Sequence, residues 1–88
     1  MKIANKDCDQ YVAGRRQFFG SNMHGIIVEA GKYVVYSYDW YPIVANVQGQ
    51  WYVTTDGYSR STKRHIYQAT KAIDPIRVSH DELKRLIA

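Results

Sequence analysis

The sequence predicts a small α+β domain, in which a curled antiparallel sheet of about four strands is flanked by short N-terminal, middle and C-terminal helices. Residues 33–44 are a run of aromatic and β-branched side chains, which favour a pleated, half-buried surface. Gly31 and Gly49 place tight turns between strand-like segments. Near the end of the chain, Ser79 and Glu82 form a capping box ahead of an apolar helical pattern. Together these observations indicate a meander of strands packed against helices.

The composition limits residues 1–88 to a single domain with a small core. The formal net charge of +4 favours acidic partners such as nucleic acid or an acidic protein surface. Cys8 is the only cysteine, so an internal disulfide is excluded and a reducing compartment is indicated. The first residues carry no apolar leader, and no stretch approaches the ~20 apolar residues of a membrane span. We therefore expect a soluble, cytoplasmic protein that makes no membrane contact.

The N-terminal segment is expected to form a short helix. Asn5 can cap it, Asp7 and Asp9 would lie in its first turn, and Gly14 would end it. Cys8 is then interpreted as a small buried hydrophobic residue rather than a reactive thiol, because no cation cluster adjoins it in sequence.

Residues 15–22 are interpreted as a basic and aromatic linker that ends in turn residues. Phe18 and Phe19 would anchor this linker to the core. In the alternative interpretation, Arg15 and Arg16 contact phosphates while a phenylalanine ring stacks on a base.

The middle of the chain carries the strand pattern. Tyr33, Val35 and Ser37 would share one face of the second strand, and Val34, Tyr36 and Tyr38 the other. A break is expected near residues 39–42, because proline fits a sheet only at a strand start, a bulge or an edge. Strands are expected over residues 24–29, 33–38, 41–47 and 50–55. One sheet face would pack on a helix, and the other would expose an aromatic face that consists of Tyr36, Tyr38 and Trp40.

Two helices are expected after the sheet. The first covers residues 63–72, with Ile66, Ala69 and Ile73 facing inward, and the pair Asp74-Pro75 ends it. Residues 76–78 form a short extended piece. The last helix follows the capping box and presents Leu83, Leu86 and Ile87 to the sheet.

A cluster of hydroxyl groups and cations precedes the middle helix and is the best candidate binding site. Such groups at a helix N-terminus suit an anion, because free backbone amides and the helix dipole add to the charge of lysine and arginine. A solvated basic surface accounts for the same pattern. The partner- or anion-binding residues predicted here are Tyr58, Ser59, Arg60, Ser61, Thr62, Lys63, Arg64 and His65.

No catalytic, metal or cofactor site is predicted. His24, His65 and His80 share no spacing that places two of them on one face of an element. Thr62 or Ser59 with His65 matches no known nucleophile motif, and neither a phosphate-binding loop nor a carboxylate pair is present. We therefore expect a protein that is not an enzyme and that takes no small-molecule substrate.

The pattern formed by residues 33–38, Pro42, Trp51, Tyr58, Ser59, Ser61, Thr62, Arg64, His65, Gln68 and Ala69 resembles a family of small, functionally uncharacterised proteins of phage and plasmid genomes. The resemblance covers roughly residues 20–69 and, more weakly, the last helix. The family usually has two threonines in place of Ser61-Thr62 and a lysine in place of Arg64; both changes keep the hydroxyl or the charge. What the resemblance implies is a mobile-element protein that acts on host or defence machinery in the cytoplasm of a bacterial cell.

We therefore expect a non-enzymatic binding protein that docks on and modulates a host or defence protein or ribonucleoprotein complex. An anti-CRISPR-like inhibitor is one form that this function could take. The aromatic face and the basic loop would form the contact, since tyrosine and arginine dominate interface hot spots. The alternative is a basic nucleic-acid-binding module, in which Arg15, Arg16 and Arg77 act beside the basic loop.

Overall fold

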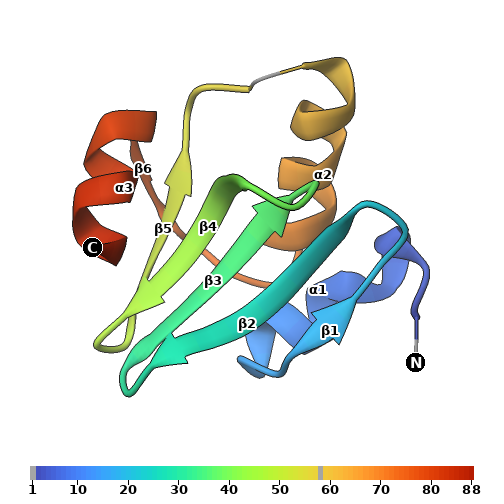
Figure 1. Cartoon of the computed structure of the whole chain (residues 1–88), viewed down its shortest axis with the longest axis horizontal. Coiled ribbons are helices and arrows are strands. Elements are labelled where there is room, and N and C mark those ends of the chain that lie inside the picture. The colour runs from blue at the N-terminus through green and yellow to red at the C-terminus, as the bar shows by residue number, and fades with distance from the viewer. Residues whose placement is uncertain (1, 58) are drawn as a thin grey trace.

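The computed structural model describes residues 2–57 and 59–88 and contains one open sheet of six strands with three α-helices (Figure 1). The strands lie in sequence order across the sheet, and each pairs antiparallel with the next except for the last two, which are parallel. The strands are β1 (Phe18–Phe19), β2 (Met23–Glu29), β3 (Lys32–Ser37), β4 (Tyr41–Val47), β5 (Gln50–Thr54) and β6 (Ile76–Val78). A 3-10 helix over Asn5–Asp7 leads into α1 (Cys8–Ala13), and α2 (Arg60–Thr70) and α3 (His80–Ile87) follow the meander.

The α+β class and the four-stranded meander are confirmed, but the expected number of strands is too low. The strands β1 and β6 had been interpreted as linker and extended piece, because two or three residues are too few to show an alternating pattern. β1 is held by β2, and β6 returns after α2 to pair with β5. Pairing with a neighbouring strand therefore creates these two strands, and for β6 that partner is 24 residues away in the sequence.

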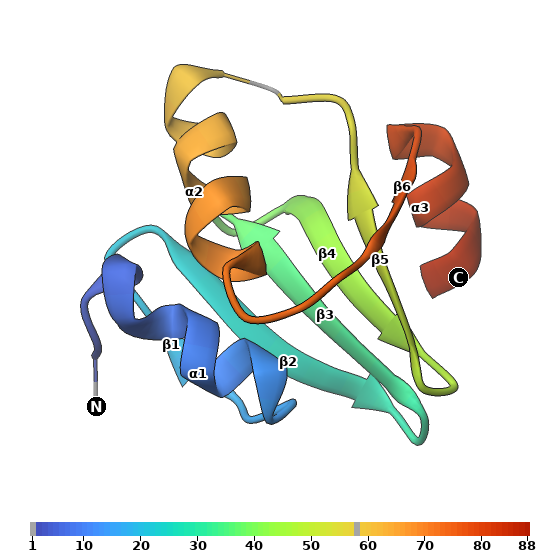
Figure 2. The same cartoon turned by 180° about the vertical axis from the view of Figure 1, so that it is seen from behind.

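Helices cover both faces of the sheet. α1 and α2 lie side by side on one face, in front of the sheet in Figure 2. α3 packs on the opposite face, over β4 and β5. The larger core, under α1 and α2, is formed by Cys8, Val12, Phe18, Met23, Tyr33, Val35, Tyr41, Ile43, Val44, Val53 and Ala69. The smaller core, under α3, is centred on Val34, Ala45 and Leu83.

Alternation along β3 divides the two cores. Tyr33 and Val35 belong to the larger core, and Val34 and Tyr36 contribute to the smaller one, as the sequence predicts. Tyr38 is the exception, and its predicted place beside Tyr36 is wrong. It follows the end of β3 with a φ of 58°, and its ring meets His65 of α2 edge-on with ring centroids 5.6 Å apart.

The break near Pro42 is confirmed. Pro42 is the second residue of β4, and the register between β3 and β4 shifts next to it, between Val35 and Tyr36. A bulge at this point accommodates a residue that cannot donate to the ladder.

Side-chain caps set the starts of two helices. Ser59 Oγ accepts from the Thr62 amide at 3.2 Å, so α2 begins at Arg60, earlier than expected. Ser79 Oγ accepts from the Glu82 amide at 3.2 Å, which confirms the predicted cap of α3.

The predicted cap at Asn5 is wrong. Its side chain instead joins the N-terminus to the turn before β2, where Oδ1 accepts from the Ser21 amide at 2.9 Å and Nδ2 donates to Asn22 Oδ1 at 2.7 Å. In the part of the chain that the structure describes, no helix combines the length and apolar character that a membrane crossing needs.

Lys32 ties the end of α3 to the sheet. Its Nζ donates to the main-chain oxygens of Ile87 at 3.2 Å and Ala88 at 2.9 Å, and it also pairs with Glu29 at 2.9 Å. A cation at this end of a helix compensates the unpaired carbonyl groups and the negative end of the dipole. β3 therefore positions α3 in two ways, through the contacts of Lys32 and through the smaller core.

Gly25→Ala is expected to destabilise the fold by about 1–3 kcal/mol, because overpacking a close contact forces the neighbours to shift. A Cβ atom at this position would collide with Tyr33 Oη and would lie 2.6 Å from the Phe18 ring. The measurement is chemical denaturation of both proteins. Gly14→Ala is the matched control, since the nearest atom to its added Cβ lies at an ordinary 3.5 Å. Equal losses in the two variants would contradict this account of the Gly25 contact.

Candidate functional site

The predicted basic loop is the N-cap and the first turns of α2, so only part of it faces outward. Arg60, Ser61, Lys63 and Arg64 are exposed, whereas Thr62 and His65 are buried. Ser59 is half-buried and caps the helix. Tyr58 lies outside the described residues. A helical period therefore divides the predicted cluster into an outer cationic group and an inner polar pair.

The inner pair forms a hydrogen-bonded network with β3. Ser37 Oγ lies 2.7 Å from His65 Nδ1 and 3.1 Å from Thr62 Oγ1, and Ser59 Oγ lies 3.2 Å from Thr62 Oγ1. Ser37 and Thr62 are fully buried, and His65 is 3% exposed. A hydroxyl sealed in this way cannot reach a substrate, so the serine and histidine together attach α2 to the sheet.

Burial controls the protonation of the groups on this side of the sheet. It lowers the pKa of His65 below its usual 6.5, with a smaller contribution from the charge of Arg64, so the buried ring is neutral. Burial also raises the pKa of the Cys8 thiol to about 11, which makes this sulfur an unreactive packing group, as the sequence predicts.

An aromatic ladder crosses the other face of the sheet, and we use this name for Phe19, His24 and Tyr36. These residues are cross-strand neighbours on β1, β2 and β3. Phe19 and His24 stack with centroids 6.0 Å apart and planes inclined by 16°, and His24 and Tyr36 stack at 5.2 Å and 18°. Three rings from three strands therefore form one continuous row.

The ladder lies on the half of this face that α3 leaves open (Figure 1). Phe19 is 58% exposed, and Trp40, just beyond the end of β3, is 56% exposed. Of the predicted aromatic face, Tyr36 and Trp40 share a slot beside α3 that also includes Pro42. Tyr38 is not part of it, because its ring packs against His65.

Sequence reasoning missed Phe19 and His24 as members of the exposed surface. The hairpin about Gly31 contains the signal for His24, since pairing β2 with β3 around this turn places His24 opposite Tyr36. Phe19 had been assigned to the core with Phe18, but successive strand residues point to opposite faces. Phe18 is buried and Phe19 is exposed.

α2 presents a cationic outer face. Arg60, Arg64, Tyr67 and Lys71 follow one another at helical spacing, and all four are exposed. The helix contains no acidic residue, and none of its cations forms an ion pair with the residues described. Because α2 and the ladder lie on opposite faces of the sheet, the two parts of the predicted contact surface are separated.

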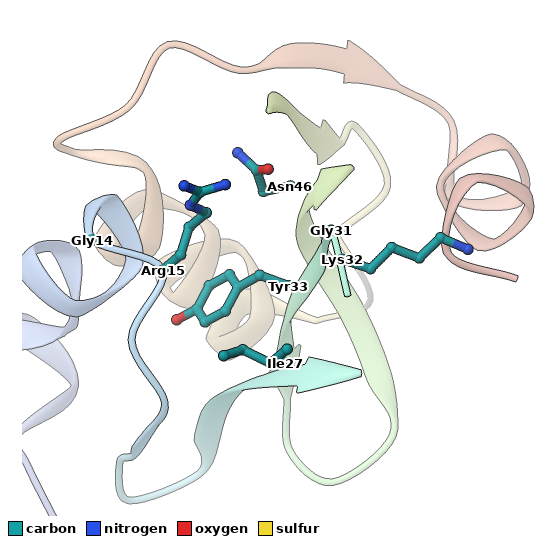
Figure 3. Close-up of a pocket in the computed structure, with 7 residues that line it drawn as sticks. All are labelled: Gly14, Arg15, Ile27, Gly31, Lys32, Tyr33 and Asn46. Atoms are coloured by element: carbon teal, nitrogen blue, oxygen red, sulfur yellow. The ribbon is translucent and has the colours of Figure 1, made fainter. Parts of the chain in front are cut away.

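Another hollow, of about 270 Å³, lies beside the turn between β2 and β3 (Figure 3). Two of its polar groups serve the fold: Tyr33 Oη donates to the Arg16 carbonyl at 2.8 Å, and Asn46 Oδ1 accepts from the Gly49 amide at 3.1 Å. The Lys32 side chain points away from it, toward α3. The exposed Arg15 also lines the hollow, and a single cation does not specify a ligand. Among the described residues, no group of three His, Cys, Asp or Glu side chains is placed to hold a metal ion.

Acidification from pH 7 to pH 5.5 is expected to lower the free energy of unfolding. Because the pKa of His65 is lower in the folded protein than its usual 6.5, the unfolded chain binds a proton that the native state does not, and stability falls as the pH drops through this range. His65→Gln should be less stable at pH 7 but should lose this acid sensitivity. Urea titrations at a series of pH values measure both effects. His24→Gln, which removes a histidine from the open face, is the control and should keep the wild-type slope; a flat wild-type profile would rule the explanation out.

Comparison with known proteins identifies a family and no individual relative. No curated protein and no solved structure gives a significant match to the chain. One family model matches residues 7–85, which include every helix and strand described above except the 3-10 helix and the end of α3. The chain therefore belongs to DUF8033, a family of unknown function.

Proposed function

We propose that the protein is a non-enzymatic binding protein that docks on a partner protein, free or within a ribonucleoprotein, through the aromatic ladder and Trp40. The observation that carries the proposal is a continuous aromatic row, exposed at Phe19 and half-buried at His24 and Tyr36, on a sheet face that α3 covers only in part. Exposed aromatic patches of this kind are typical of interaction surfaces, where tyrosine and tryptophan provide much of the binding energy.

The orientation of the rings supports a protein partner over a nucleic acid on this face. Phe19 and Tyr36 each stack on His24 with nearly parallel planes, so both faces of His24 are occupied. Single-strand binders stack bases on free ring faces, and the His24 ring at the centre of the row has none left to offer. A row of rings that pack against one another suits a groove of a partner protein.

The proposed partner is a component of host or defence machinery. The resemblance to phage- and plasmid-encoded proteins supports a host or defence protein, or a ribonucleoprotein, that this chain would modulate as an inhibitor. A small domain of this kind can inhibit a larger complex by covering one of its binding surfaces, since an interface of ordinary size buries only about 800 Å² on each partner.

Phe19→Thr is expected to abolish partner capture without loss of folding. Phe19 is 58% exposed, and threonine keeps the preference for a strand. Ile27→Thr is the matched control, since it removes an apolar side chain of similar exposure, 55%, at a residue of β2 that pairs with Tyr33 and so lies on the other side of the sheet. The measurement is crosslinking and affinity purification from the native cell, with quantitative mass spectrometry of both variants. If every captured protein is retained by Phe19→Thr, the ladder is not the docking surface.

A second candidate function, direct binding of nucleic acid, is favoured by the outer face of α2. Four exposed cations, Arg60, Lys63, Arg64 and Lys71, surround the exposed ring of Tyr67. Alternation of cations with an aromatic side chain suits a polynucleotide, because phosphates meet the cations while a base stacks on the ring.

Arg60→Gln with Arg64→Gln is expected to weaken any nucleic-acid binding at least tenfold and to reduce its dependence on salt, since fewer counterions would be displaced. Lys2→Gln with Arg85→Gln lowers the net charge by the same amount at sites remote from this helix face and should have little effect. Gel shifts with random single- and double-stranded oligonucleotides at several salt concentrations provide the measurement. No retardation of the wild-type complex at low salt would reject this candidate.

A further inference from the structure

The aromatic ladder ends at Tyr36 on β3, and no fourth ring follows it on β4. On β1, β2 and β3 its members are direct cross-strand neighbours, and the residue that pairs with Tyr36 on β4 is Pro42. Paired residues share a face of the sheet, so Pro42 occupies the next place in the row, and its side chain is not aromatic. His24 covers one face of the Tyr36 ring. The other face of the Tyr36 ring is therefore turned toward the space above Pro42.

A slot of about 350 Å³ occupies this place. Tyr36 and Pro42 line it from the sheet, and Trp40 lines it from the turn that joins β3 to β4. From α3 come His80, Lys84 and Ile87, which are spaced to share one helix face. The volume is at the lower end of the range for small ligand pockets and suits one large side chain.

We propose that this slot is a socket for an aromatic side chain of the partner protein, which binds as the fourth ring of the ladder with a neighbouring carboxylate on Lys84. The inference rests on the proposed docking function and adds the chemistry of the partner. A ring above Pro42 would stack on Tyr36 at the spacing that the existing rings already use, 5.2 and 6.0 Å, which lies within the favourable range for aromatic pairs.

The charges around the slot point to a single carboxylate. Lys84 is the one fully charged side chain in the lining, and it has no ion pair among the described residues. His80 also lines the slot, and its ring stacks on Tyr41 with centroids 4.3 Å apart and planes inclined by 4°, so it acts as a wall of the slot.

A polynucleotide fits the same surroundings poorly. It would bring a phosphate with every base, whereas the lining provides a single lysine, and the exposed acids Asp39 and Asp81, next to slot residues in the chain, would repel every phosphate beyond the first. A peptide segment with one acidic residue beside its aromatic residue requires only one cation, and Lys84 provides it. The charge pattern therefore favours a peptide segment of a protein.

The test uses N-acetyl-L-phenylalanine, which carries a ring and a carboxylate, as a probe for the full-length protein in ¹H–¹⁵N NMR titrations. A ligand of about 15 non-hydrogen atoms with ordinary efficiency binds with a Kd on the order of 1 mM. We expect saturable shifts at the amides of Tyr36 and Lys84 and at the Trp40 indole. N-acetyl-L-alanine should not bind, and the uncharged amide of the probe should bind about two- to fivefold more weakly at low salt.

Variants connect the binding to the named groups. Lys84→Gln should remove the preference for the carboxylate over the amide, and Arg85→Gln, the same charge change at the next position of α3, should keep it. Tyr36→Leu should abolish saturable binding while its amide spectrum stays dispersed, which would show that the fold is intact.

Two results would overturn the proposal. The first is the absence of saturable shifts at the slot in the wild-type protein. The second is tighter, Lys84-dependent binding of adenosine monophosphate at the same amides, which would assign the slot to a nucleotide. If the probe does not bind in the slot but Phe19→Thr loses partner capture, the socket alone is rejected. If Phe19→Thr captures the same proteins as the wild type, the docking function itself is rejected.

Discussion

The structure depends on one constraint: three short helices must cover two faces of a six-stranded sheet. β3 is the strand on which this matters most, because Tyr33 and Val35 face one layer of helices while Val34 faces the other. α1 and α2 together cover the first face, and α3 alone, with eight residues, covers part of the second. The uncovered half carries the aromatic ladder. The proposed docking surface is thus the part of this face that none of the described helices covers.

The buried network of Ser37, Thr62 and His65 shows how the covered face is kept in register. Polar groups without access to water are costly unless they are paired, and here each of them has a partner within 3.1 Å. An apolar contact would tolerate a sliding helix, whereas this arrangement fits only one position of α2 on β3. The same network fixes which side of α2 faces outward, and so it aligns the arginines of the cationic face.

The elements with a strong local pattern could be predicted from the sequence. The strand bounds of β4, the cap of α3 and the turn at Gly31 follow from β-branched runs, a capping box and glycine chemistry. The short strands β1 and β6 could not be found, because their existence depends on partners 5 to 24 residues away rather than on their own residues. The candidate binding residues are chosen by type, but the division of the basic cluster by the helical period and the place of Tyr38 required coordinates. Ring stacking between Phe19, His24 and Tyr36 arises from register, and register is a property of pairs of strands.

The parallel pairing of β5 with β6 has a consequence for the order of folding. The hairpins of the meander close short loops and can form early, whereas β6 must wait until α2 has been spanned. α3 follows β6 directly, so it reaches the sheet only after this last step. We therefore expect that a nascent or partly unfolded chain acquires the ladder before it acquires the slot, so that the proposed socket would be present only in the completed native state.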